Sequence, residues 1–176
     1  MKAIFPIIYS LLLFVSLSLI TVYLFGQIRL TRKAEKKLLA LEQKIYKKNN
    51  TYEDLYKLGQ IYLGKKNYNK AITLFRESLK EWNLNDKIGL ASIYNTLGFT
   101  YFKLEQYDYA IYYYNQAIEI IPDYILALTN LGFCYEERKN YEQALSTYNQ
   151  ILNFDQNNRK VNEKLLLSET SLAVTV

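Results

Sequence analysis

Few side chains in this chain could carry out covalent or metal chemistry. Its 176 residues include no His, the usual general base and metal ligand near neutral pH, and Cys134 is the single Cys. One thiol allows neither an intrachain disulfide nor a thiolate metal cluster, and a lone Cys among apolar neighbours is usually an inert packed residue. The carboxylates of Glu53-Asp54 and Glu136-Glu137 are adjacent in sequence, so on a helix they point in different directions. We therefore predict no catalytic residue, no metal site and no cofactor, and we predict that the chain is not an enzyme.

The chemistry that remains is recognition by apolar and aromatic side chains, which recur at a fixed spacing in three copies. Each copy has a Leu-Gly pair, a Tyr three residues after the Gly, another Tyr nine residues after it, then an Ala and an aromatic residue. The second and third copies lie 34 residues apart and the first and second 39 apart, so five extra residues separate the first copy from the second. The matching residues are Leu58, Gly59, Tyr62, Tyr68, Ala71 and Phe75 in the first copy, Leu97, Gly98, Tyr101, Tyr107, Ala110 and Tyr114 in the second, and Leu131, Gly132, Tyr135, Tyr141, Ala144 and Tyr148 in the third.

The spacing within each copy is that of two amphipathic helices. In the second copy Tyr94, Leu97 and Tyr101 recur every three or four residues, and the pattern resumes at Tyr107 after the short stretch 103–106. We predict two antiparallel helices of about 12 to 14 residues in each copy, joined by a turn at this stretch. A Gly inside a helix costs about 1 kcal/mol relative to Ala, so a Gly at the same place in all three copies predicts that two helices approach closely there.

The pattern resembles the tetratricopeptide repeat, which carries Leu-Gly, Tyr, Ala and Phe at these places and often ends in Pro. By this resemblance the copies span 52–85, 91–124 and 125–158 and stack as an all-α solenoid of three helix pairs. Only the middle copy has the Pro, at Pro122. The insertion around Asp86 to Leu90 predicts a longer or irregular turn before the second repeat.

The open end of such a stack needs a cap, because its last apolar face would otherwise meet water. The stretch 159–174 predicts a final helix that covers this end. The apolar residues assigned to the contact are Val161, Leu165, Leu166 and Leu172.

An uncharged apolar segment precedes the repeats. The stretch 3–28 holds 26 residues without a charge, and about 20 suffice for a helix to cross the hydrocarbon core of a bilayer. The alternative is a cleaved secretory signal, but such a signal has a shorter apolar stretch, and Phe25-Gly26-Gln27 is a poor cleavage site. We predict an uncleaved transmembrane anchor.

The positive charge of the chain lies next to this anchor. Residues 29–48 carry eight basic and two acidic side chains, a net charge of +6, whereas residues 49–176 carry 13 basic and 15 acidic side chains, a net charge of −2. Positive residues stay on the non-translocated side, so we expect the repeats in the cytoplasm or stroma and the N-terminus across the membrane. The basic segment 29–48 suits contact with anionic lipid headgroups, as 3–28 suits the lipid core, and the repeats do not suit nucleic acid.

These observations predict four parts. The transmembrane anchor occupies residues 1–28, a basic juxtamembrane helix 29–50, the three repeats 51–158, and the capping helix and tail 159–176. The anchor helix is expected to continue to about residue 48, and Thr51, with Asp54 three residues later, is expected to cap the first repeat helix.

The resemblance also implies where a partner binds. In the family the first helix of each pair lines a groove through its second, fifth, ninth and twelfth positions. Carried over, the partner-binding residues are Tyr56, Gln60, Asn95, Phe99, Phe102, Thr129, Phe133 and Glu136, with an aromatic floor of Tyr56, Phe99, Phe102 and Phe133. The alternative is that some of these side chains pack against neighbouring repeats or the terminal helix.

One partner class of the family is disfavoured. Family members that hold the acidic tails of cytosolic chaperones use Lys, Arg and Asn as a clamp on carboxylates. The matching positions here hold no cation, so we predict no chaperone-tail clamp and favour an apolar or amphipathic partner segment. These positions are Tyr56, Gln60, Thr96, Leu126 and Asn130.

The second helix of the middle copy has surplus Tyr residues. Tyr109, Tyr112 and Tyr113 are not repeat positions, and at least one is expected to face outward. They form either a second contact patch on the convex side or no site at all. The latter follows if the 18 Tyr of the chain merely reflect an AT-rich genome.

The order and size of the parts resemble one family closely, the small membrane-anchored tetratricopeptide proteins of cyanobacteria and algal plastids that assist the assembly or stability of photosystem I. This resemblance implies a thylakoid membrane, repeats in the stroma or cytoplasm, and a photosystem I subunit or assembly intermediate as the partner. Two other functions remain open. One is a membrane docking receptor for a soluble protein, and the other is a permanent structural subunit of a membrane complex.

Overall fold

The helices of this protein follow one another without a strand between them, as the sequence pattern predicts. The computed structural model describes residues 4–47 and 49–175, and this part of the chain contains eight helices and no strand. The chain divides into two compact units, residues 1–48 and residues 49–176.

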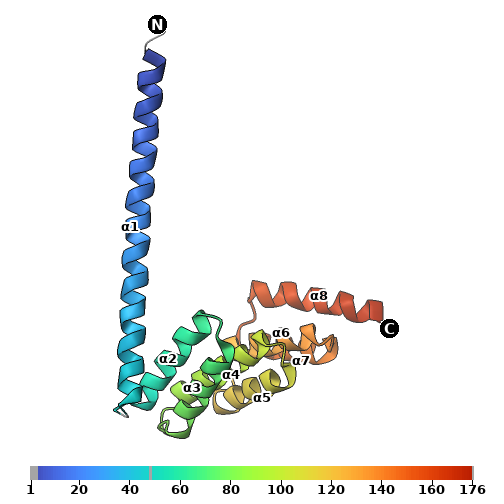
Figure 1. The fold of residues 1–176 in the computed structure, drawn as a ribbon. Helices are drawn as coiled ribbons and strands as arrows, with labels where there is room; N and C mark the ends of the chain where they lie inside the picture. Colours follow the sequence, from blue (N-terminus) through green and yellow to red (C-terminus); the bar gives the residue numbers. More distant parts are fainter. Residues whose placement is uncertain (1–3, 48, 176) are drawn as a thin grey trace. The chain divides into compact units, whose positions relative to one another are not determined.

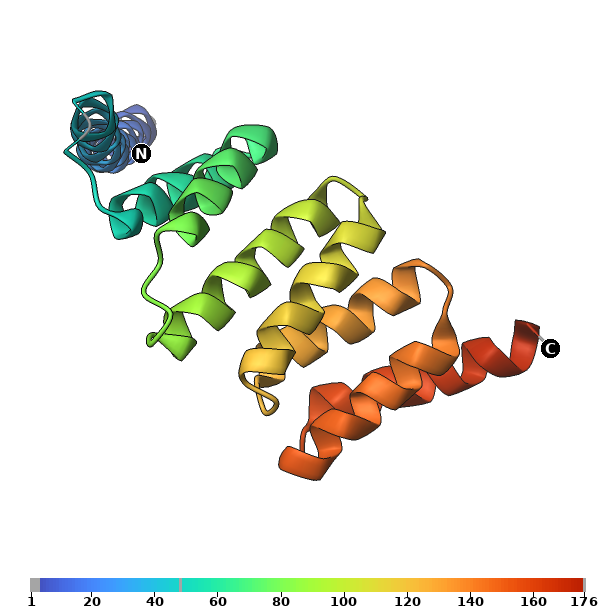
Figure 2. The ribbon, with the colours of Figure 1, turned by 90° about the horizontal axis from the view of Figure 1, so that it is seen from below.

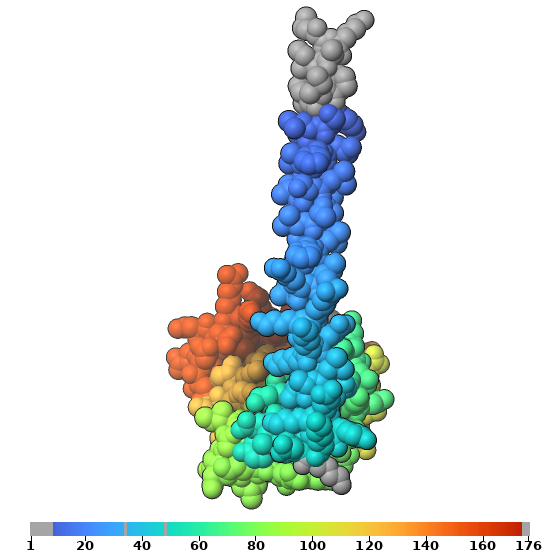
Figure 3. Space-filling model, turned by 60° about the vertical axis from the view of Figure 1, so that its left-hand side comes forward, coloured from blue at the N-terminus to red at the C-terminus, as the bar shows by residue number. Residues whose placement is uncertain are grey.

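The first unit is one long helix, α1, which runs from Ile4 to Tyr46 (Figure 1). Its 43 residues correspond to a length of about 64 Å. The side chains of residues 9–33 are exposed (Figure 3), and the apolar part of the helix is long enough to cross a membrane by length and composition. The predicted continuation of the anchor helix into the basic segment is therefore confirmed as far as Tyr46. Ala3 and Lys48, the outer ends of the two predicted segments, lie outside the described residues.

The second unit consists of three helix pairs and a final helix, as predicted. Figure 2 shows the pairs and the final helix in a row, each pair beside the next. The helices are α2 (Tyr52–Gly64), α3 (Tyr68–Lys80), α4 (Lys87–Lys103), α5 (Tyr107–Ile120), α6 (Ile125–Glu137), α7 (Tyr141–Phe154) and α8 (Arg159–Thr175). We call α2, α4 and α6, the first helices of the pairs, the inner helices.

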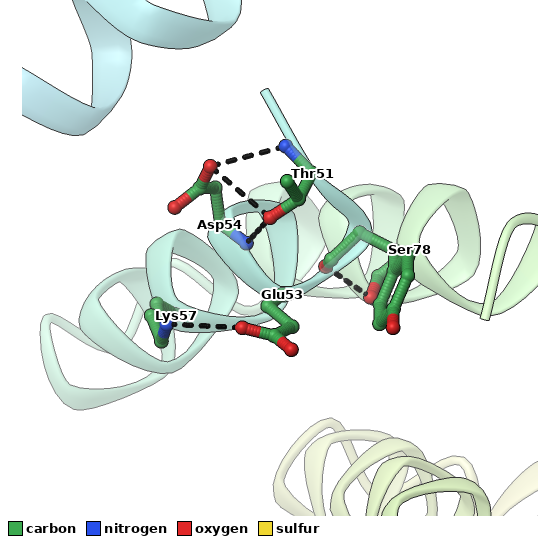
Figure 4. Close-up of polar contacts among 6 residues, drawn as sticks. Thr51, Glu53, Asp54, Lys57 and Ser78 are labelled. Atoms are coloured by element: carbon green, nitrogen blue, oxygen red, sulfur yellow. Dashed lines mark hydrogen bonds and ion pairs between the residues drawn. The ribbon is translucent and has the colours of Figure 1, made fainter. Parts of the chain in front are cut away.

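The first inner helix begins where the sequence predicts. The Thr51 hydroxyl accepts the backbone N–H of Asp54 at 3.3 Å, and the Asp54 carboxylate accepts the backbone N–H of Thr51 at 3.0 Å (Figure 4). This reciprocal capping box satisfies two N–H groups that have no partner inside the helix. Ser78 of α3 ties the same turn to the second helix, because its hydroxyl donates to the carbonyl of Tyr52 at 2.6 Å.

The turn inside each pair has the same geometry in all three repeats. Lys66, Glu105 and Lys139 each have a φ of 59°, the left-handed region. The N–H of the following residue donates to a carbonyl of the helix just ended, for example from Asn67 to Tyr62 at 2.9 Å. This is the Schellman arrangement that ends a helix and lets the next one start after a short turn.

The repeated Gly lies against the repeated aromatic ring of the same pair. A Cβ atom on Gly59 would lie 2.5 Å from the ring of Phe75, and one on Gly98 would lie 2.7 Å from the ring of Tyr114. Gly132 and Tyr148 are related in the same way. The absence of a side chain at each Gly therefore lets a large ring of the second helix fill the space between the two helices, and all three rings are buried.

The link before the second repeat is longer than the other links between repeats, as predicted, but most of the inserted residues are helical. The link between α3 and α4 comprises residues 81–86, only slightly longer than 121–124 or 155–158, and α4 has 17 residues instead of 13 or 14. The reason is a local structure around Trp82, which is buried and packs on Tyr52 at a ring distance of 4.8 Å. Its indole N–H donates to Asp86, whose second carboxylate oxygen caps α4 by accepting the N–H of Gly89 at 2.9 Å.

The final helix α8 covers the end of the stack, but not with all of the predicted residues. Val161 is buried against Leu128, Tyr148 and Ile151 of the third pair. Leu166, which the sequence assigned to the same contact, is 62% exposed. Ser168 is buried instead, and its hydroxyl donates a hydrogen bond to the carboxylate of Glu136 in α6.

Candidate partner-binding groove

The inner helices line a hollow, open to solvent, at the middle of the repeat unit. This central hollow has a volume of about 490 Å³. Its walls include Gln60 and Leu63 of α2, Asn95 and Phe99 of α4, and Leu126 and Asn130 of α6. Three of the predicted partner-binding residues, Gln60, Asn95 and Phe99, are thus brought together in one place.

Phe102 and Phe133 form a second group beside this hollow. Their rings lie 5.4 Å apart at 48°, an arrangement that joins α4 to α6. The ammonium group of Lys103 lies 5.1 Å from the ring centre of Phe99 and 5.7 Å from that of Phe102. A cation within about 6 Å of an aromatic face is attracted to it. The predicted aromatic floor therefore has a lysine at its edge.

The last two predicted residues, Phe133 and Glu136, are held by α8. The ammonium group of Lys164 lies 4.6 Å from the ring centre of Phe133 and 2.6 Å from a carboxylate oxygen of Glu136. Ser168 donates to the other oxygen of Glu136 at 2.9 Å. The Glu136 side chain is 13% exposed and the Lys164 side chain 38% exposed, so the carboxylate is the better shielded partner of this ion pair. Part of the predicted groove is thus in contact with the terminal helix.

Tyr56 lies between repeats rather than on an open floor. Its ring packs on Phe75 at 5.5 Å and on Trp82 at 5.8 Å. Its hydroxyl is hydrogen-bonded to Ser92 at 3.2 Å and to Thr96 at 3.3 Å. These contacts join the first repeat to the second, which is one of the two alternatives that the sequence left open.

Asn95 and Thr129 are also engaged within the protein. Asn95 is 8% exposed and accepts a hydrogen bond from the side-chain amide of Asn130 at 3.0 Å. The hydroxyl of Thr129 donates to the carbonyl of Ile125 at 2.7 Å. Asn95 and Thr129 therefore have fewer hydrogen-bonding groups left for a partner than the exposed Gln60.

The chemistry of the described side chains is that of a binding surface. In the described part of the chain no group of three or more carboxylates and thiols is arranged to hold a metal ion. Burial raises the pKa of the Cys134 thiol to about 12, so that the protonated form prevails near neutral pH. A protonated thiol is a poor nucleophile, which agrees with the prediction that Cys134 is a packed residue.

The surplus Tyr residues form a stacked row on the second pair. The ring of Tyr101 lies 5.2 Å from that of Tyr109 and 5.3 Å from that of Tyr113, and Tyr112 meets Tyr113 edge-on at 5.1 Å. Tyr109 and Tyr112 are exposed, as expected for at least one of the three, and Tyr113 is half-buried. Burial raises the pKa of Tyr113, so the Tyr113 ring stays neutral over the physiological range.

Comparison with known proteins gives the family. The tetratricopeptide repeat family matches residues 50–123 and 90–157. A ycf37 protein of Guillardia theta is 41% identical over 167 residues, which make up 95% of this chain and 94% of that protein. The chain is a tetratricopeptide repeat protein of the ycf37 family.

Other relatives and solved structures agree with this assignment. The ycf37 protein of Cyanophora paradoxa is 35% identical over 84% of this chain and 85% of its own length. The chloroplastic tetratricopeptide repeat domain-containing protein PYG7 of Arabidopsis thaliana is 30% identical over 86% of this chain and 50% of that protein. The fold is also that of MamA, with a TM-score of 0.68, 23% identity and coverage of 82% of this chain and 76% of MamA. The first repeat domain of RPAP3, solved with an HSP90 peptide, has a TM-score of 0.61, with 20% identity over 70% of this chain and 96% of that domain.

Three side chains of this ycf37-family chain that touch the predicted site were missed by the sequence analysis. They are Lys103, Lys164 and Ser168. The numbering of the repeats contains a signal for Lys164, because it lies 34 residues after Asn130, which lines the central hollow. The predicted cap rested on the apolar residues of the last helix alone, and Lys164 is not one of them.

Proposed function

We propose that this chain is a single-pass membrane protein whose repeats hold a protein partner during the assembly or stabilisation of photosystem I. The observation that carries the proposal is the central hollow, where side chains of three inner helices meet around Phe99. Tetratricopeptide repeats bind proteins through such surfaces, and the relatives include a chloroplastic protein.

The anchor supports the membrane part of this proposal. The apolar stretch of α1 matches the thickness of a hydrocarbon core, and the helix continues through residues 29–46 for about 27 Å more. The basic side chains of this continuation keep it on the non-translocated side and attract anionic headgroups. The membrane is then the thylakoid, and the repeats face the stroma or, in a cyanobacterium, the cytoplasm.

The proposed arrangement keeps the four parts predicted above: anchor 1–28, basic helix 29–50, repeats 51–158, and capping helix and tail 159–176. Within the predicted site, Gln60, Phe99 and Phe102 belong to the partner-binding surface. Tyr56 supports that surface from behind, through its contacts with Phe75 and Trp82. The clamp positions hold no cation, which disfavours a carboxylate tail as the main partner.

The proposal is tested by partner recovery from thylakoid membranes. Full-length chain carrying Phe99→Glu should recover at least tenfold less photosystem I protein after crosslinking than the unchanged chain, because a carboxylate in place of the ring removes the apolar contact and must lose its water when the partner binds. Phe154→Glu is the matched control, since Phe154 is an exposed aromatic residue of α7 that lines neither hollow. Unchanged recovery with Phe99→Glu would contradict the proposed groove.

The other two functions give different results in the same experiment. A docking receptor should recover a soluble protein in place of photosystem I subunits. A permanent subunit should be recovered at equal stoichiometry with the mature complex, whereas an assembly factor should be found with partly built complexes. Deletion of the gene should lower photosystem I relative to photosystem II. Normal levels in every growth condition would contradict the assembly role.

A further inference from the structure

Helix α8 continues the series of inner helices beyond the third repeat. Leu167 lies 34 residues after Phe133 and so occupies a groove position of a fourth inner helix, and Lys164 lies 34 residues after Asn130, which lines the central hollow. Leu167, Lys164 and Glu136 line a second hollow of about 330 Å³. Figure 2 shows α8 next in the row after the third pair.

We propose that α8 is part of the partner-binding surface, and that this surface takes an amphipathic helix whose apolar face is flanked by carboxylates. This inference rests on the proposed function, because it describes the partner of the same groove. α8 is then a fourth helix of the site, and the segment that binds there is an acidic amphipathic helix.

An apolar strip crosses the inner helices and α8. α4 contributes the half-buried Phe99, α6 contributes Leu126 and Phe133, which are 54% and 36% exposed, and α8 contributes Leu167, which is 60% exposed. α2 contributes the half-buried Leu63 at the other end. The strip passes over four helices of the row, so an occupant that covers it must be long enough to cross all four.

The backbone of the partner favours a helix over an extended segment. An extended segment needs hydrogen-bond partners for its N–H and C=O groups, and those left unpaired on burial are costly. Several polar groups of this surface are already bonded within the protein, so they are not free to pair with the backbone of an extended segment. Asn130 donates to Asn95, Thr96 donates to the carbonyl of Ser92 at 2.7 Å, and Ser168 donates to Glu136. A helix satisfies its own backbone groups and needs only the apolar strip.

Two lysine side chains place positive charge at the edge of this apolar strip. The ammonium group of Lys103 lies over the rings of Phe99 and Phe102, and that of Lys164 lies over Phe133, so cations stand at the edge of the strip. Glu136 pairs with Lys164, and no carboxylate among the described residues pairs with Lys103. Carboxylates beside the apolar face of the bound helix would pair with Lys103, whereas a basic helix would be repelled.

The experiment compares two adjacent leucines of α8. Leu166 is 62% exposed and Leu167 is 60% exposed, but Leu167 lines the second hollow and Leu166 does not. A photo-crosslinking residue is placed at either position in the full-length chain in its native membranes, and the attached peptide is sequenced. Position 167 should give at least tenfold more crosslinked partner than position 166, and the attached segment should have apolar residues three and four apart with Asp or Glu beside them. Equal yields, or a segment without this spacing, would overturn the proposal.

Crosslinking from position 99 separates this inference from the proposed function. A photo-crosslinking residue at Phe99 that captures photosystem I protein, with none captured from position 167, leaves the groove in place and rejects the role of α8. No capture from either position rejects both. Lys103→Glu should lower recovery at least tenfold while Lys80→Glu, a change on the exposed end of α3, leaves it unchanged. Equal recovery with both would reject the carboxylate-bearing helix.

Discussion

Gly98 of α4 lies directly against the ring of Tyr114 in α5, so close that a Cβ atom would come within 2.7 Å of it. Gly98→Ala should therefore lower the free energy of unfolding by about 1 kcal/mol or more, because overpacking a core costs about 1–3 kcal/mol and exceeds the helix propensity gained by Ala. The change is measured by urea unfolding of the full chain in detergent, followed by the fluorescence of Trp82, the single Trp. Gly64→Ala is the control, since nothing lies within 4 Å of a Cβ atom there, and it should be neutral or stabilising.

The left-handed residues of the turns offer a change of opposite sign. Lys66 has a φ of 59°, where a side chain is strained and Gly is not. Lys66→Gly should raise the free energy of unfolding by about 1 kcal/mol. Lys65→Gly should not, because Lys65 has a φ of −80° and gains nothing from the freedom of Gly. A loss of stability with Lys66→Gly would show that the Lys66 side chain makes a contact that outweighs the strain.

Stability should fall at alkaline pH through Cys134. Burial raises the pKa of this thiol from 9.0 to about 12 in the folded protein, so above pH 9 the unfolded chain releases a proton that the folded chain keeps. The stabilising contribution is complete below pH 9 and is lost as the pH rises towards 12, at up to about 1.4 kcal/mol per pH unit. Urea unfolding at several pH values checks this.

Cys134→Ser provides the comparison for the pH series, since a Ser hydroxyl does not titrate in this range. Between pH 9 and 10 the variant should lose less stability than the unchanged chain. Above pH 10 both should lose stability, because burial also raises the pKa of Tyr114 and of Tyr148. Identical curves for the two chains between pH 9 and 10 would contradict a raised pKa for the thiol.

The topology predicts the outcome of proteolysis of intact membranes. Protease added from the stromal or cytoplasmic side should digest residues 49–176 and leave a fragment that contains the apolar part of α1, because the eight basic residues of 29–48 hold that flank on the accessible side. Mass spectrometry of the protected fragment gives its ends. Protection of the repeats under these conditions would reverse the predicted orientation.

The sequence predicted most of the fold because the repeat places the same residue types at the same helical positions three times. Thr51 with Asp54 also predicted the start of α2, since a capping box is a local interaction. The start of α4 could not be predicted in this way. It depends on Trp82 packing against Tyr52, a contact between helices that a repeat pattern does not encode.

The candidate site was predicted less well, for the same physical reason. Phe99 and Gln60 line the central hollow, but the surroundings of Tyr56 depend on Trp82, which has no counterpart in the other repeats. Leu166 and Leu167 are chemically alike and adjacent, so composition alone could not decide which one faces the surface of the groove. That distinction appears only when the repeat numbering is continued into α8.

The Trp82 junction also makes the repeats unequal as building blocks. Gly89 lies so near the indole that a Cβ atom would come within 2.5 Å of the Trp82 ring, so the first and second repeats fit each other only with this pair of residues. The second and third repeats meet through a plain four-residue link, 121–124, without such a pair. A unit inserted between the first and the second repeat would therefore have to supply a matching Trp and Gly at its own junctions, whereas a unit added after the second repeat would not.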